Sequence, residues 1–157
     1  MPDVLKLAFV GCGAIARFHL DGIHASCGDR VRVTAAVDPD RAKAERIAAE
    51  TGAQVFPSLA EGLSGGDFDA VDLMLPHDLH EAAAVQAFQA GKHVLLEKPM
   101  APTLDACDRI LAAAKAAGTV FMVAENAQYW PEIVKVKELI DAGELGRVAF
   151  MEANFSN

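Results

Sequence analysis

The sequence is poor in aromatic and basic side chains, and both shortages exclude classes of function. Aromatic residues make up 6% of the 157 residues, and 14 Lys and Arg stand against 22 Asp and Glu, giving a formal net charge of −8. A chain this acidic is a poor non-specific binder of phosphate backbones and offers few rings for base stacking. We therefore expect no nucleic-acid partner, and any anionic ligand must be held by backbone N–H groups or by a few placed cations.

Long apolar runs and paired cysteines are also missing. The longest apolar stretch, residues 110–124, is interrupted by a lysine and a glycine and is shorter than the roughly 20 residues that span a bilayer. The first residues lack the basic segment and cleavage site of a signal peptide. Cys12, Cys27 and Cys107 are widely spaced without a CxxC motif, which suits a reducing compartment and gives neither a disulfide framework nor a zinc site. We expect a cytoplasmic protein with no membrane segment.

Short apolar runs alternate with alanine-rich helical segments along the first 124 residues. Strands separated by helices of this length indicate βαβ crossovers and a parallel sheet. The fold class expected is therefore α/β, with a doubly wound parallel sheet. The expected strands are residues 5–10, 31–37, 54–56, 70–75, 93–96 and 120–124. The expected helices are residues 14–27, 40–51, a short one opening at 57–59, 77–90 and 103–117.

Capping residues and a glycine indicate where helices begin and end, and the handedness of the crossovers indicates which loops bind a ligand. Asp40 and Ser58 are placed to cap the second and third helices, and Gly52 to end the second. Right-handed crossovers bring the loops that follow the strands to one edge of the sheet, where ligands bind in such folds. The loops at that edge are residues 11–16, 38–41, 75–80, 97–99 and 125–129.

The first of these loops reads G-x-G-x-x-A and joins a strand to a helix. Its residues are Gly11, Cys12, Gly13, Ala14, Ile15 and Ala16. Gly11 permits the tight turn, Gly13 lets a pyrophosphate approach the backbone, and Ala16 lets the helix pack close to the sheet. The unpaired N–H groups at the helix start would then hold the phosphates. Cys12 is interpreted as a small residue facing the ligand or the core rather than as a reactive thiol.

Asp38 strengthens the interpretation as a dinucleotide site. It ends the second strand, 22 residues past Ala16, where a carboxylate accepts hydrogen bonds from the adenosine ribose hydroxyls. The same carboxylate repels a 2′-phosphate, which favours NAD over NADP. Arg41 is close enough to hold a phosphate or to stack on adenine, so NADP stays open. The alternative is a glycine-rich turn followed by an aspartate that only caps a helix.

Three further loops carry polar side chains to the same edge. The segment from Leu75 and Pro76 to His77 and His80 would pass under the ribose and pyrophosphate. The two histidines share a face if that segment is helical, but two histidines without a third ligand more often cap a helix or contact a ligand, so we expect no metal.

Lys98 is the candidate catalytic residue. In Glu97-Lys98-Pro99 the ammonium faces the crevice, where it could donate to a substrate oxygen and stabilise negative charge. Lys98–Pro99 is a candidate cis bond. The alternative is a surface Glu–Lys pair before a helix. In the last loop, Asn126 and Gln128 could hydrogen-bond the nicotinamide or the substrate.

The pattern changes after residue 124. Residues 130–142 are expected to form a helix and residues 147–155 a strand. We therefore divide the chain into a dinucleotide-binding domain, residues 1–124, and residues 125–157, a connecting helix and the first strand of an α/β domain that is otherwise absent.

Taken together, these segments resemble the glucose-fructose oxidoreductase/inositol dehydrogenase family, Gfo/Idh/MocA. The resemblance covers essentially the whole chain, and Glu-Lys-Pro is its most specific element. The matching segments are residues 11–16, 36–38, 75–80, 91–99, 123–131 and 143–148. It implies a Rossmann domain followed by an α/β domain, and an NAD(P)-dependent oxidoreductase that acts on sugars, inositols or related hydroxylated compounds.

The resemblance also implies roles for individual residues. Lys98 would be the catalytic or substrate-orienting lysine, and Glu97 would line the nicotinamide ribose. The residues along the cofactor would be Leu75, Pro76, His77 and His80.

The chain departs from the family pattern in three places. His77 stands where the family often has Asn, and Gln128 stands where a basic residue is frequent. The Asp/His pair of the family's larger domain has no counterpart. The sequence is thus interpreted as an N-terminal half that is a poor catalyst alone. The alternatives are a non-catalytic dinucleotide-binding or regulatory module, and a chain that forms a homo-oligomer through its terminal strand.

Overall fold

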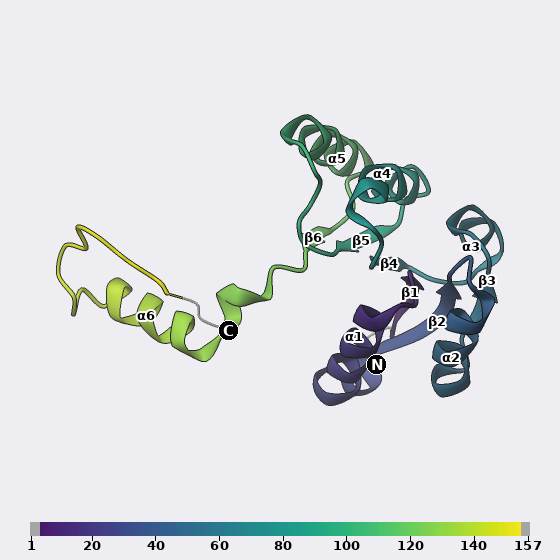
Figure 1. The fold of residues 1–157 in the computed structure, drawn as a ribbon, viewed down its shortest axis with the longest axis horizontal. Helices are drawn as coiled ribbons and strands as arrows, with labels where there is room; N and C mark the ends of the chain where they lie inside the picture. Colours follow the sequence, from purple (N-terminus) through teal and green to yellow (C-terminus); the bar gives the residue numbers. More distant parts are fainter. Residues whose placement is uncertain (1–3, 155–157) are drawn as a thin grey trace. The chain divides into compact units, whose positions relative to one another are not determined.

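A six-stranded parallel sheet organises the computed structural model, which describes residues 4–154 (Figure 1). The strand order is β3-β2-β1-β4-β5-β6, and every neighbouring pair is parallel. This order reverses direction between β1 and β4, which is the switch point of a doubly wound sheet. The strands are β1 (Leu5–Val10), β2 (Val31–Val37), β3 (Gln54–Phe56), β4 (Ala70–Leu73), β5 (His93–Leu96) and β6 (Phe121–Val123).

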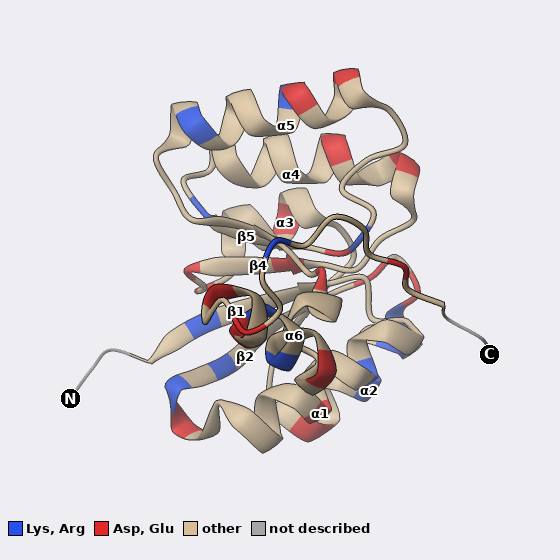
Figure 2. Ribbon diagram, turned by 90° about the vertical axis from the view of Figure 1, so that its left-hand side faces the viewer, with Lys and Arg blue, Asp and Glu red and all other residues tan. Residues whose placement is uncertain are grey.

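Helices cover both faces of this sheet, so the central strands are buried on both sides. Ala8 and Val10 of β1 pack in one apolar cluster, whereas Leu7 and Phe9 pack in a second cluster on the opposite face. Figure 2 shows α4 and α5 on one side of the sheet and α1 and α2 on the other. The helices are α1 (Ala14–Ser26), α2 (Arg41–Thr51), α3 (Leu59–Gly65), α4 (His80–Gln89) and α5 (Leu104–Ala117), with short 3₁₀ turns at Gly28–Arg30 and His77–Leu79.

The helix boundaries follow local hydrogen-bond chemistry. The Asp40 side chain accepts from the N–H of Ala42, and the Ser58 hydroxyl accepts from the N–H of Glu61. Gly52 ends α2 in the left-handed conformation that glycine adopts at little cost. The expected caps and the fold class are therefore confirmed. The edges of single elements differ by one to three residues; β4, for example, ends at Leu73 rather than at residue 75.

The described residues divide into two compact units, one up to Ala124 and one from Glu125 onward. The second unit contains a 3₁₀ turn, η3 (Asn126–Tyr129), and the helix α6 (Pro131–Asp141). The assignment of residues 125–157 to a separate substrate domain stays a prediction. None of the described helices is long and apolar enough to cross a membrane.

The expected strand at residues 147–155 is wrong over the part that the structure describes. Residues 147–154 have no strand conformation, and residue 155 lies outside the described residues. A strand exists through hydrogen bonds to a neighbouring strand, and no described residue supplies that partner to this segment. The alternation of apolar residues in this segment is typical of a strand, but the pattern does not show whether a neighbouring strand is present. The homo-oligomer expected through this segment stays a prediction.

Replacement of Leu20 by alanine should lower the free energy of unfolding by about 2–5 kcal/mol. Leu20 is 0% exposed and packs between α1 and the sheet, so its loss leaves a cavity. Leu104→Ala is the matched control, because Leu104 is 82% exposed and its loss should cost less than about 0.5 kcal/mol. Urea unfolding followed by circular dichroism measures both. Equal losses in the two variants would contradict the described packing.

Candidate functional site

The turn after β1 requires glycine at its first position. Gly11 has φ of +90°, and its N–H donates to the Val37 carbonyl at 2.8 Å. A Cβ on Gly11 would lie 2.3 Å from the Met74 carbonyl oxygen and 2.9 Å from its carbon. The main chains at the ends of β1 and β4 therefore approach too closely for any side chain at this position.

Gly13, unlike Gly11, lies beside open space. It caps α1 without a side-chain hydrogen bond, and a Cβ placed on it would meet no atom within 4 Å. Ala16, one turn later, is completely buried against the sheet, as its expected packing role requires. The first turn of α1 therefore presents backbone N–H groups and the positive end of the helix dipole beside open space, an arrangement that attracts anions.

A cavity of about 460 Å³ adjoins this turn. Gly13 and Ala14 form part of its lining together with the cationic side chains of Arg17, Lys43 and Arg46. Arg17 is already paired with Asp21 and Glu50, at 2.7 Å in both cases. Lys43 lies 3.6 Å from an Asp40 carboxylate oxygen, so among the described residues Arg46 is the lining cation for which no ion pair is found.

Asp38 joins the end of β2 to the glycine turn. Its side chain is nearly buried, with 8% of the residue exposed. Oδ2 accepts from the N–H of Cys12 at 2.8 Å, and Oδ1 accepts from the N–H of Asp40 at 2.8 Å. An ionised carboxylate has about four acceptor positions, so these two bonds leave capacity for hydroxyl donors.

The Cys12 thiol is structural. It is buried and donates to the Val37 carbonyl at 3.7 Å. Burial, together with the negative charge of Asp38, raises the pKa of Cys12 to about 12. The thiol therefore stays protonated at neutral pH and is no nucleophile, in agreement with its interpretation as a small buried residue.

Two hollows lie at the end of β2, and Asp38 lines the smaller of them. One of about 160 Å³ is lined by Asp38, Arg41, Val55 and Pro57. A second, of about 320 Å³, is largely apolar; Val10, Pro57 and Leu75 are among the residues that line it. Nε of Arg41 lies 2.7 Å from a Glu45 carboxylate oxygen, in a largely exposed pair. The smaller hollow therefore combines charged and apolar side chains, whereas the larger one, lined by the two sequence neighbours of Asp38, is mainly apolar.

His80 is inaccessible, and this corrects the expectation that it contacts a cofactor. The residue is 0% exposed. Nε2 lies 2.9 Å from the Leu75 carbonyl oxygen, and Nδ1 lies 3.0 Å from that of Pro99 and 3.3 Å from that of Met100. Both ring nitrogens are thus engaged with main chain, and His80 ties the loop after β4 to the loop after β5.

His77, in contrast, is exposed, and its ring meets that of His80 edge-on at 5.5 Å between centroids. Within the described residues, no three His, Cys, Asp or Glu side chains gather as a metal site.

The loop after β5 presents Lys98 on a fixed main chain. The Lys98–Pro99 bond is cis, as expected. The Lys98 N–H donates to Oε2 of Glu97 at 2.8 Å, and the Glu97 N–H donates to the Leu73 carbonyl at 3.0 Å. Lys98 itself is exposed, whereas Glu97 is partly buried. The side chain of Lys98 is therefore accessible to a small molecule while its backbone is held by β4 and Glu97.

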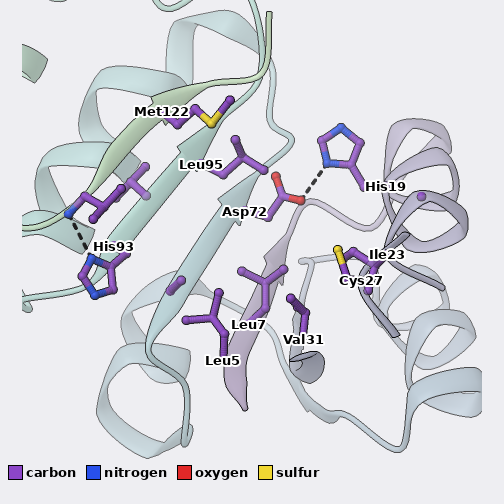
Figure 3. A pocket seen from close by; sticks show the side chains of 14 residues that line it. Leu5, Leu7, His19, Ile23, Cys27, Val31, Asp72, His93, Leu95 and Met122 are labelled. Atoms are coloured by element: carbon purple, nitrogen blue, oxygen red, sulfur yellow. Dashed lines mark hydrogen bonds and ion pairs between the residues drawn. The ribbon is translucent and has the colours of Figure 1, made fainter. Parts of the chain in front are cut away.

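Two functional candidates, His19 and Asp72, were missed in the sequence. Nδ1 of His19 lies 2.7 Å from Oδ2 of Asp72, and Nε2 lies 3.0 Å from Oε1 of Glu97 (Figure 3 shows the first contact). The available signal was an aspartate inside the strand Ala70–Leu73, in which every residue is buried.

The pKa values of His19 and Asp72 are both raised. The hydrogen bond to Asp72 and the charges of both carboxylates outweigh burial and raise the pKa of His19. Burial raises the pKa of Asp72 despite the His19 contact. The shift of His19 keeps a proton on the ring at a pH at which a free imidazole has lost it.

A hollow of about 410 Å³ opens over the sheet beside this pair. In Figure 3 its walls are mainly apolar side chains, such as Leu7, Ile23, Leu95 and Met122, with Asp72 and His19 at one end. None of the residues of the glycine turn lines it, so it is separate from the cavity beside Gly13.

Most expected site residues meet at one edge of the sheet. The glycine turn, Asp38, the loop 75–77 and the pair Glu97–Lys98 follow the carboxyl ends of β1, β2, β4 and β5. Asn126 and Gln128 belong to the second unit, where Nε2 of Gln128 donates to the Glu125 carbonyl at 2.9 Å. Their role toward a nicotinamide or a substrate stays a prediction.

Comparison with known proteins gives a consistent result. The profile GFO_IDH_MocA, described as an oxidoreductase family with an NAD-binding Rossmann fold, matches residues 5–125. An inositol 2-dehydrogenase of Rhodococcus erythropolis is 36% identical over 145 residues, which are 91% of this chain and 42% of the relative. A 1-carboxy-3-chloro-3,4-dihydroxycyclo hexa-1,5-diene dehydrogenase of Comamonas testosteroni is 38% identical over 125 residues, 79% of this chain and 32% of the relative.

Solved structures agree. The WlbA dehydrogenase of Bordetella pertussis, in complex with NADH and UDP-GlcNAcA, is similar with a TM-score of 0.88 and 33% identity, over 94% of this chain and 42% of that one. GenD2 from gentamicin A biosynthesis, in complex with NAD, has a TM-score of 0.83 and 31% identity, over 92% of this chain and 41% of that one. The chain thus spans between about a third and a half of the length of the proteins that it matches.

Gly11→Ala should destabilise the chain, whereas Gly13→Ala should not. The first substitution combines a positive φ with overlap of Cβ and the Met74 carbonyl, and should cost at least about 1–3 kcal/mol. The second puts a methyl group into open space at a negative φ and should change stability by less than about 0.5 kcal/mol. Urea unfolding of both variants measures the difference, and a stable Gly11→Ala protein would refute the close approach of β1 and β4.

Proposed function

This chain belongs to the GFO_IDH_MocA oxidoreductase family, with its NAD-binding Rossmann fold, and we propose that residues 1–124 bind NAD along the carboxyl edge of the sheet. The observation that carries this proposal is the Asp38 carboxylate, which is fixed against the Cys12 N–H beside open space at Gly13. A ribose held by Asp38 and a pyrophosphate at the start of α1 would then belong to one adenosine diphosphate.

The parts of the site fit the parts of that ligand. The bare Gly13 and the N–H groups of the first turn of α1 suit the pyrophosphate. The free acceptor positions of Asp38 suit the ribose hydroxyls, and the apolar hollow beside Pro57 and Leu75 suits the adenine ring. Bound NAD would supply the nicotinamide ring that gives or accepts a hydride. The chain supplies binding and orientation.

We propose NAD rather than NADP as the preferred cofactor. A 2′-phosphate would have to approach the nearly buried carboxylate of Asp38. The cation that lines the same hollow, Arg41, is paired with Glu45 and is largely exposed. Screening by water weakens what Arg41 offers to a phosphate, whereas the repulsion from a fixed carboxylate at close range persists.

Lys98 is the proposed catalytic residue for a dehydrogenase reaction. Its ammonium is exposed on a main chain that is held by Glu97 and by Leu73 of β4. A cation placed beside a nicotinamide can donate a hydrogen bond to the oxygen of the carbon that exchanges the hydride, and can stabilise an alkoxide there. The substrate class that we propose is a small polyhydroxylated compound, in line with the inositol dehydrogenases and the UDP-sugar complex among the similar proteins.

We further propose that the protein acts in the cytoplasm. Cys12, Cys27 and Cys107 are all unpaired in the structure. Free cysteines, two of which (Cys27 and Cys107) are partly accessible, suit a reducing compartment better than an oxidising one.

Titration of the purified chain with NADH, followed by cofactor fluorescence, tests the binding proposal. We expect saturable binding that weakens at least roughly tenfold in Gly13→Ala, because the methyl group takes the space of the pyrophosphate. Gly22→Ala is the control on the same helix, where a Cβ also meets open space. NADPH should bind more weakly than NADH. Absence of saturable binding at millimolar NADH would refute the proposal, and equal affinity for NADPH would refute the cofactor preference.

Lys98→Met should separate turnover from cofactor binding. In an assay with NAD and a panel of inositols and sugars, we expect turnover to fall by roughly 10²–10⁴-fold, because the donor to the substrate oxygen is lost. The affinity for NADH should change less than about twofold. Lys115→Met, an exposed lysine in the last turn of α5, is the matched control. Unchanged turnover in Lys98→Met would exclude the catalytic role.

A further inference from the structure

A chain of hydrogen bonds connects the helix α1 to the main chain at Lys98. The His19 ring lies between two carboxylates, 2.7 Å from Asp72 and 3.0 Å from Glu97. Asp72 is 1% exposed, and its Oδ1 has no hydrogen-bond partner among the described residues. The other carboxylate oxygen of Glu97 accepts from the Lys98 N–H at 2.8 Å. Each oxygen of Glu97 thus has one partner, His19 on one side and Lys98 on the other.

The geometry requires one proton more than a neutral imidazole carries. Both ring nitrogens of His19 lie within hydrogen-bond distance of a carboxylate oxygen, whereas a neutral imidazole has a single N–H. An imidazolium donates to both carboxylates and leaves the group with a net charge of −1. If the ring loses its proton, a nitrogen lone pair faces a carboxylate oxygen, and that contact becomes repulsive. The contact with Glu97 is the longer one, at 3.0 Å, and Glu97 is the more exposed carboxylate.

Within residues 4–154, Asp72 and Glu97 are the carboxylates that pair with His19. On α1, Arg17 pairs with Asp21 and with Glu50 of α2. Around the neighbouring hollow, the titratable groups besides Asp72 are Cys27 and His93, and the His93 Nδ1 accepts from the Val120 N–H at 2.9 Å.

We propose that His19 is a positioning residue, which as an imidazolium holds the Glu97 carboxylate and, through it, the main chain at Lys98. The loop that carries the proposed catalytic lysine is therefore held most firmly when His19 is protonated. When the ring loses that proton, the contact between His19 and Glu97 is lost before the contact with Asp72. The consequence for cofactor binding rests on the proposed function, whereas the link from His19 to Lys98 does not.

The direction of the pH effect follows from the raised pKa of His19. The folded chain keeps the proton at a pH at which the unfolded chain, with an ordinary imidazole near 6.5, has lost it. The contribution of His19 to stability is therefore complete below about pH 6.5 and disappears as the pH rises through the raised pKa. The Lys98 loop should loosen in the same interval.

NMR of the chain without cofactor tests the link directly. We expect the His19 ring to titrate with a midpoint above 6.5, and the Lys98 amide resonance to move with the same midpoint. In His19→Gln this movement of the Lys98 amide should disappear, whereas His24→Gln, an exposed histidine of the last turn of α1, should leave it unchanged. In Glu97→Gln the His19 ring should still titrate, but the Lys98 amide should no longer follow it.

Each outcome decides the proposal. A Lys98 amide that ignores the His19 titration in the wild-type chain, or that still follows it in Glu97→Gln, would overturn the positioning role and leave His19 a purely structural contact. A His19 midpoint at or below 6.5 would overturn it as well. If His19→Gln fails to fold, the wild-type and Glu97→Gln titrations still give the answer.

The affinity for NADH is a second, independent measurement. If Glu97 lines the nicotinamide ribose, the wild-type chain should bind NADH about 2- to 10-fold more weakly above the His19 midpoint than below it, the loss expected for one hydrogen bond. His19→Gln should have the weaker affinity at both values of pH. A chain that binds no NADH but shows the coupled NMR titration would refute the proposed function and retain the positioning role.

Discussion

The candidate site depends on one buried carboxylate. Asp38 accepts from the Cys12 N–H on one side and from the Asp40 N–H on the other, so a single side chain joins the glycine turn after β1 to the start of α2. A carboxylate that is 8% exposed would be costly without such partners. Because both partners are main-chain groups, the carboxylate is fixed in place. Its remaining acceptor positions would serve the ribose hydroxyls of the proposed NAD, and the open space at Gly13 would take the phosphates.

The charge of the chain is compatible with an anionic ligand because most of the binding capacity is main chain. The net charge is −8, yet the first turn of α1 contains no acidic side chain. The partial positive charge of its N–H groups is therefore available to an anion. The cations beside the same cavity are partly paired, as Arg17 is with Asp21 and Glu50. In the proposed site, discrimination between NAD and NADP would come from Asp38, whereas attraction of the pyrophosphate would come from the start of α1. Different residues would therefore set cofactor preference and cofactor affinity.

The sequence predicted what local chemistry determines. The alternation of apolar runs and helices gave the parallel sheet, and side chains such as Asp40 and Ser58 gave the helix boundaries, because each signal acts within a few residues. The errors and omissions involve partners far along the chain. His80 lies at helical spacing from His77, but the carbonyl oxygens that bury it come from Leu75 and from Pro99 and Met100. His19 and Asp72 are 53 residues apart, and no local pattern connects them.

The buried ring of His80 has a mechanical consequence. It connects the loops after β4 and β5, because each of its ring nitrogens contacts the main chain of a different loop. The two loops must therefore shift together, and the spacing from Leu75 to His80 cannot change without detaching the ring from one of its anchors.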